Sequence, residues 1–174
     1  PMWKQWSVLL DTSICCFTAS KPWPLMNDLF NRLSISFEFL LKNEQYEIIR
    51  PYHLILLFYS IIYDSKNDKP IILLSEYASS NCEEAPFMMA STTFILSLFD
   101  RLLAKDPKSP IFAPLCFLII YVLYYSPSSI SEIRSDLDLS KLPFLIFRKD
   151  LPMRTRVFCA AIVACLVTTF EKLQ

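Results

Sequence analysis

The residues best suited to acid–base chemistry are one histidine and two pairs of neighbouring carboxylates. The only histidine is His53, and the pairs are Glu83 with Glu84 and Asp136 with Asp138. A histidine or a carboxylate pair can act as a general acid or base only where a fold fixes its geometry. No nucleophile–base pattern is readable around His53. We interpret all five as helix or loop residues, and we predict no catalytic residue and no enzymatic activity.

The six cysteines are the other reactive side chains, and their spacing does not favour a metal site. None forms a C-x-x-C pair, and a single histidine gives little support for a zinc site. We predict no metal and no cofactor. Cys116, Cys159 and Cys165 lie inside apolar runs, where we expect buried thiols acting as small hydrophobic residues. Free thiols are typical of a reducing compartment, so we expect an intracellular protein of the cytoplasm or nucleus.

The absence of glycine from all 174 residues limits both function and fold. Average usage is about 7%. Without glycine there is no glycine-rich phosphate loop, no dinucleotide-binding fingerprint and no usual nucleophile elbow. Hairpin turns and bulges also depend on glycine, whereas helices joined by proline and polar loops do not. The predicted class is therefore all-α.

Prolines and polar loops divide the chain into apolar runs with helical spacing. Pro51 fits the first turn of its helix, where a missing N–H costs least. Asp150 is expected to cap the last helix. Helices are predicted over residues 25–41, 46–63, 71–78, 87–104, 111–126, 129–139 and 153–173, with a short apolar element over 141–147.

Internal similarity predicts a repeat of helices. A shift of 63 residues places Lys42 on Lys105 and Pro51 on Pro114, with the apolar runs coinciding. A shift of 44 residues places 105–125 on 149–169. Each unit is interpreted as a helix, a polar loop and a more apolar helix, usually followed by a short capped helix.

The stretch "LCFLIIYVLYYSPSSISEIRSDLDLSKLPFLIF" (115–147) resembles the armadillo/HEAT superfamily of α-helical repeats. Ser140 stands where that family usually has a glycine. The resemblance implies a right-handed α-solenoid, a single domain over 25–174 with about three units at 25–80, 86–139 and 141–174. Residues 1–24 are expected to pack on these units. The implied function is a non-catalytic protein–protein interaction scaffold, a subunit or fragment of a larger intracellular complex.

Three runs, near 51–63, 111–126 and 155–170, raise the alternative of a small multi-span membrane protein. A membrane span needs about 20 apolar residues. These runs are shorter, so we favour helices of a protein core. Residues 115–125 are nevertheless apolar on every side, and something must cover the second face. The N-terminal segment, a neighbouring repeat or another chain could do so.

Charge is balanced over the chain, at 17 basic and 17 acidic residues, but it is unevenly distributed. Residues 141–174 contain six basic and two acidic residues, a net charge of +4, which favours an acidic protein partner. Basic residues are not interleaved with stacking aromatics, so nucleic acid is not favoured. Aromatic residues are common at partner surfaces. The candidate partner-binding residues are Trp3, Trp6, Tyr121, Tyr124, Tyr125, Arg148, Lys149, Arg154 and Arg156.

Overall fold

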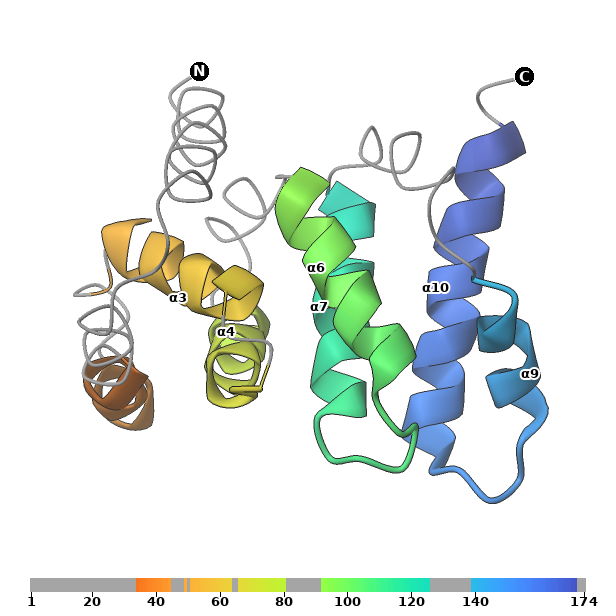
Figure 1. Ribbon diagram of the computed structural model, residues 1–174, viewed down its shortest axis with the longest axis horizontal. Coiled ribbons are helices and arrows are strands. Elements are labelled where there is room, and N and C mark those ends of the chain that lie inside the picture. The colour runs from red at the N-terminus through yellow and green to blue at the C-terminus, as the bar shows by residue number, and fades with distance from the viewer. Residues whose placement is uncertain are drawn as a thin grey trace.

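The described part of the chain is helical. The computed structural model describes residues 34–44, 49, 51–63, 66–80, 92–125 and 139–171, and these contain helices and loops but no strand. One helix covers 34–42, and the labelled helices are α3 (Pro51–Tyr63), α4 (Lys69–Ser80), α6 (Thr92–Ala104), α7 (Phe112–Tyr125), α9 (Lys141–Phe147) and α10 (Met153–Glu171) (Figure 1). The all-α prediction is confirmed for these residues. Residues 129–138 of the expected helix over 129–139 and the expected N-terminal segment 1–24 lie outside them, and Leu139 is in a turn.

Local hydrogen bonding explains where the helices begin. The helix α3 begins at Pro51, later than the predicted run over 46–63, and Pro51 stands in its first turn as the sequence predicts. The helix α4 begins at Lys69, two residues before its predicted start. The side chain of Asn67 accepts a hydrogen bond from the Lys69 amide at 3.1 Å, and the Asp68 carbonyl accepts one from the Ile71 amide at 3.2 Å. These loop residues satisfy N–H groups that a helix start leaves unpaired, so the helix extends into the polar segment.

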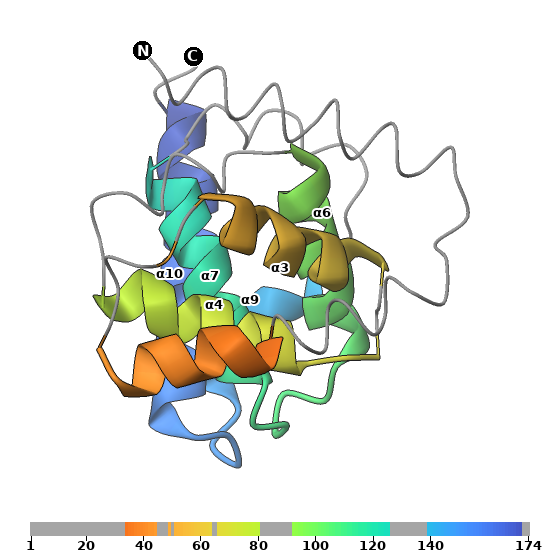
Figure 2. The same ribbon diagram turned by 90° about the vertical axis from the view of Figure 1, so that its left-hand side faces the viewer.

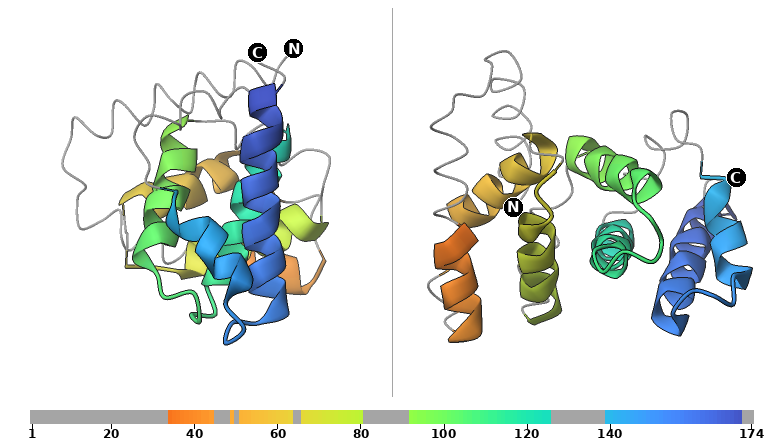
Figure 3. Two further views of the ribbon diagram at one scale, coloured as in Figure 1. Left: turned by 90° about the vertical axis from the view of Figure 1, so that its right-hand side faces the viewer. Right: turned by 60° about the horizontal axis from the view of Figure 1, so that its bottom comes forward.

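The helices pack in two layers with α7 at the centre. The helix α7 contacts α4, α6 and α10, while α3 packs on α4 and α6, and α9 packs on α10. The helices α4, α7 and α10 therefore form one layer, with α3 and α6 above α4 and α7 (Figure 3). The helix at 34–42 lies beside α4 (Figure 2), where the rings of Phe37 and Tyr77 meet edge to face at 5.8 Å.

Three helical neighbours explain why α7 is apolar on every side. Its residues from Phe112 to Leu123 include eight buried side chains, several of them with no exposed surface. Each fully buried aliphatic side chain contributes about 2 kcal/mol from the area it removes from water. Of the three ways to cover this helix that the sequence leaves open, the structure supports neighbouring helices of the same chain.

Helix length bears on the membrane alternative. The runs considered as membrane spans correspond to α3, α7 and α10, which contain 13, 14 and 19 residues. Across the residues that the structure describes, no helix is both long enough and apolar enough to cross a bilayer.

Candidate functional site

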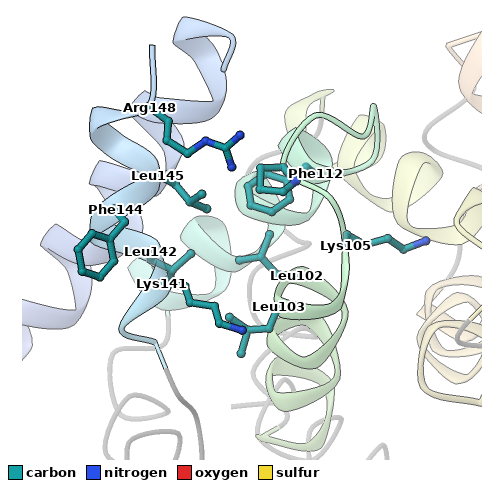
Figure 4. Close-up of a pocket in the computed structure, with 10 residues that line it drawn as sticks. Leu102, Leu103, Lys105, Phe112, Lys141, Leu142, Phe144, Leu145 and Arg148 are labelled. Carbon is teal, nitrogen blue, oxygen red and sulfur yellow. The ribbon is translucent and has the colours of Figure 1, made fainter. Parts of the chain in front are cut away.

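A groove of about 350 Å³ opens between α6, the start of α7 and α9. Its lining combines apolar side chains with three basic ones and contains no acidic side chain (Figure 4). The residues are Leu102, Leu103, Lys105, Pro107, Phe112, Lys141, Leu142, Phe144, Leu145 and Arg148. An apolar groove with a few charged groups at its edge has the composition of a binding site for an amphipathic partner.

The groove lies at the end of the layer formed by α3 and α6, between α6 and α9. The helix α3 packs on α6, but α6 and α9 share no comparable contact. The helix α9 has only seven residues, of which Leu142 alone is buried. Phe144 and Phe147 on the same helix keep 72% and 80% of their surface exposed. The described residues thus leave one side of α9 apolar and accessible.

The loop between α6 and α7 positions one end of the groove. The side chain of Asp106 accepts a hydrogen bond from the Lys108 amide at 2.9 Å, which is an Asx turn. The Asp106 carbonyl accepts a second from the Ser109 amide at 2.8 Å, and the Ser109 carbonyl accepts one from the Phe112 amide at 3.0 Å. These bonds hold the loop and bring the ring of Phe112 into the groove wall.

At the Arg148 end of the groove, an ion-pair cluster links the loop between α6 and α7 to the loop between α9 and α10. The sequence predicts Asp150 as the cap of α10, but the structure pairs it with two cations. The guanidinium of Arg148 donates to both oxygens of Asp150, at 3.0 and 2.6 Å, and the Lys108 Nζ lies 3.1 Å from Asp150 Oδ2. The Arg148 and Lys108 hydrogen bonds lower the pKa of Asp150, and the Asp150 bond raises the pKa of Arg148. The charge of Asp106 also acts on Arg148, so two carboxylates lie near two cations at this end of the groove.

The basic residues of the lining differ in where their charges point. The Nζ of Lys105 lies 2.7 Å from Asp68 Oδ2 and is directed away from the groove (Figure 4). By contrast, Lys141 reaches toward Leu103 and Arg148 toward Phe112 (Figure 4). Within the described residues, no carboxylate forms an ion pair with Lys141. The groups that can meet a ligand's charge in the groove are therefore the ammonium of Lys141 and the Nη1 of Arg148. The Nε and Nη2 of Arg148 are already bonded to Asp150.

The predicted tyrosines lie at the other end of α7. Tyr121 is 7% exposed and belongs to the core, while Tyr124 and Tyr125 are 72% and 41% exposed. The rings of Tyr121 and Tyr125 are 4.9 Å apart, and those of Tyr124 and Tyr125 are 5.0 Å apart. Phe112 and Tyr124 are twelve residues apart, or about 18 Å along a helix. The structure does not bring these tyrosines to the groove.

The predicted basic residues are also dispersed. Arg148 lines the groove, and Lys149 is exposed outside it. Arg154 stacks on Phe158, with its guanidinium carbon 5.3 Å from the ring centroid. Arg156 directs one nitrogen toward the Met153 sulfur at 3.9 Å. Trp3 and Trp6 lie outside the described residues, so the structure places only Arg148 of the predicted set in the groove.

The structure does not place the five candidate acid–base residues together in a site, because only His53 is among the residues it describes. His53 lies in α3, and the four carboxylates Glu83, Glu84, Asp136 and Asp138 fall outside the described residues. No cluster of three or more metal-binding side chains occurs in the described ranges.

Cysteine placement follows the sequence prediction where it is described. Cys116 and Cys159 are buried free thiols, and Cys165 is a partly buried free thiol. A hydrogen bond with Cys159, together with burial, raises the pKa of Cys116. Burial alone raises the pKa of Cys165. The same hydrogen bond lowers the pKa of Cys159. The raised pKa values of Cys116 and Cys165 favour protonated thiols that serve as apolar packing groups.

Comparisons with protein-family models, with curated proteins and with solved structures found no match to this chain.

Proposed function

We propose that this chain is a non-catalytic protein–protein interaction scaffold. It is an armadillo/HEAT-like right-handed α-solenoid of about three units, working as a subunit or fragment of a larger intracellular complex in a reducing compartment. The observation that carries the proposal is the groove between α6 and α9, which has an apolar lining, a basic edge and accessible phenylalanines beside it.

The helix spacing supports a repeat. The helices α4, α7 and α10 share a layer and begin at residues 69, 112 and 153, which are 43 and 41 residues apart. The helices α3 and α6 of the other layer begin at 51 and 92, again 41 apart. Armadillo and HEAT repeats have about 40–47 residues. Successive helices in both layers are thus separated by nearly the same number of residues, as in stacked repeats.

The accessible apolar surface supports an interaction role. Phe144 and Phe147 are exposed aromatics on one short helix, and Leu142 and Leu145 continue the apolar surface into the groove. Aromatic side chains placed beside a desolvated pocket are typical anchors of protein interfaces. A concave surface of stacked helices is the usual binding face of repeat proteins.

The proposal can be tested by site-specific photo-crosslinking in cells. A benzophenone amino acid replaces Phe144, and a matched variant carries it at Ile72, which is also exposed but lies on α4. We expect one protein to crosslink at Phe144 and not at Ile72. That protein, once purified, should bind the wild-type chain and lose at least tenfold in affinity for Phe144→Asp.

Two results would contradict the scaffold proposal. One is the absence of any crosslinked protein when the benzophenone stands at Phe144. The other is equal binding of the purified partner to the wild type and to Phe144→Asp. Because Phe144 is largely exposed, its substitution should leave the fold intact, which circular dichroism checks. An experimental structure with a left-handed or irregular stacking of helix pairs would contradict the solenoid part.

A further inference from the structure

We infer that the groove binds an acidic amphipathic helix of a partner protein, with two carboxylates about two turns apart. This inference rests on the proposed scaffold function and specifies its partner. Lys141 and Arg148 stand at the two ends of the α9 wall, and the apolar residues Leu142 and Leu145 lie between them (Figure 4).

The spacing of the two cations sets the spacing of the ligand's charges. Lys141 and Arg148 are seven residues apart, which is about 10 Å along a helix. A ligand helix lying along α9 presents side chains at positions i and i+7 with the same separation and on the same face. Carboxylates at these positions meet the two cations, and apolar residues at i+3 and i+4 fall between them onto the groove floor.

Charge complementarity selects an acidic ligand over a basic or neutral one. From residue 141 to residue 157 the chain carries five basic residues and one acidic residue. That acidic residue, Asp150, already pairs with Arg148 and Lys108. A basic helix would bring like charges to both ends of the groove, whereas an acidic one gains charge-assisted hydrogen bonds at each.

The test uses synthetic peptides held helical by a hydrocarbon staple on the solvent face. The acidic peptide has two glutamates seven positions apart, with leucines three and four positions after the first glutamate. The comparison peptide has lysines in place of both glutamates. Fluorescence anisotropy measures their binding to the purified chain at 50 mM and 300 mM salt. We expect the acidic peptide to bind at least tenfold tighter, with a preference that shrinks at the higher salt.

Two charge variants and one apolar variant locate the site. Lys141→Glu should weaken the acidic peptide at least fivefold, and Phe144→Asp should weaken it further. Lys149→Glu is the matched control, because it makes the same charge change on an exposed neighbour outside the groove lining. Its effect should stay below twofold. Equal losses for Lys141→Glu and Lys149→Glu would overturn the assignment to the groove.

Other outcomes distinguish this inference from the scaffold proposal. Equal affinity for both peptides, no binding of either, or equal binding of a proline-broken acidic peptide would overturn the acidic-helix inference. So would displacement of the peptide by a single-stranded oligonucleotide of equal affinity. In each case a partner crosslinked at Phe144 would leave the scaffold proposal standing. Conversely, selective peptide binding without any crosslinked protein would support the groove chemistry and contradict the cellular role.

Discussion

The guanidinium of Arg101 on α6 donates a hydrogen bond to the main-chain carbonyl of Ile61, forty residues earlier in the last turn of α3. The same guanidinium donates to the Asn67 carbonyl at 3.0 Å, in the loop that leads into α4. Arg101 is only 6% exposed. A buried cation here satisfies one carbonyl that the end of α3 leaves unpaired and complements the helix dipole. Arg101 therefore holds α6 to the connection between α3 and α4.

Replacing Arg101 by methionine should destabilise the fold. The variant keeps the aliphatic bulk but leaves the buried Ile61 carbonyl and the partly buried Asn67 carbonyl without their donor. We therefore expect the free energy of unfolding to fall by about 3 kcal/mol. Urea denaturation followed by circular dichroism measures it. Lys105→Met is the control, because its ion pair with Asp68 is partly exposed and should be worth less than about 1 kcal/mol. Equal losses in the two variants would show that the Arg101 hydrogen bonds carry no special weight.

Because α7 lies at the centre of the fold, substitutions at its buried and exposed positions should differ sharply in their effect on the free energy of unfolding. Leu118→Ala empties a fully buried site, so the free energy of unfolding should fall by about 2–5 kcal/mol. Tyr124→Ala removes a larger but 72% exposed side chain and should change it by less than about 0.5 kcal/mol. Thermal and urea unfolding of both variants check this. A tolerant Leu118 would mean that α7 is not the centre of the core.

Sequence patterns predict the positions of the helices along the chain better than they predict which helices pack together. The start of α3 at Pro51 and the short element over 141–147 could be read from proline positions and apolar runs, because these are local properties. The pairing of α3 with α7 through a 63-residue shift is not supported, since the two helices lie in different layers. Both are strongly apolar, and composition alone does not record which layer a helix occupies.

The groove could be predicted only in part. The basic segment in the sequence identifies Arg148 as a candidate partner-binding residue, but that segment does not distinguish Lys141 and Phe144 from their neighbours. Their role depends on the distance between α6 and α9, which the packing of α9 on α10 determines. The spacing of Lys141 and Arg148 on either side of "LPFLIF" was the available signal. Tyr121 shows the reverse case: an aromatic residue at the end of an apolar run can be core or surface, and burial decides which.

The raised pKa of Cys116 predicts a loss of stability at high pH. The hydrogen bond with Cys159 and burial hold the proton on this thiol above its usual pKa of about 8.5. The folded state therefore binds the proton more tightly than the unfolded state. The resulting stability is complete below about pH 8.5 and is lost as the pH rises above it, by about 1.4 kcal/mol per pH unit.

A Cys116→Ala variant isolates this contribution. Its unfolding free energy, compared with the wild type by urea denaturation at pH 7.5, 9 and 10, should differ less as the pH rises. A difference that stays constant across this range would contradict a raised pKa at Cys116. The thiol should also react with an alkylating reagent at pH 8 far more slowly in the folded chain than in urea.

Asp150 predicts the opposite pH dependence. Its carboxyl pKa is lowered by Arg148 and Lys108, so the folded state releases the proton more readily than the unfolded state. The stability from this cluster is complete above the unfolded pKa of about 3.9 and is lost as the pH falls below it. The urea midpoint of Asp150→Asn should therefore lie below that of the wild type at pH 7, and the gap should narrow as the pH falls from about 4 toward 2. Added salt should narrow the gap at pH 7, because the cluster is exposed. Lys108→Gln should lower the urea midpoint at pH 7 by part of the same amount, and Lys149→Gln should leave it unchanged. A gap between Asp150→Asn and the wild type that persists unchanged at pH 2 would refute a structural role for the charge of Asp150.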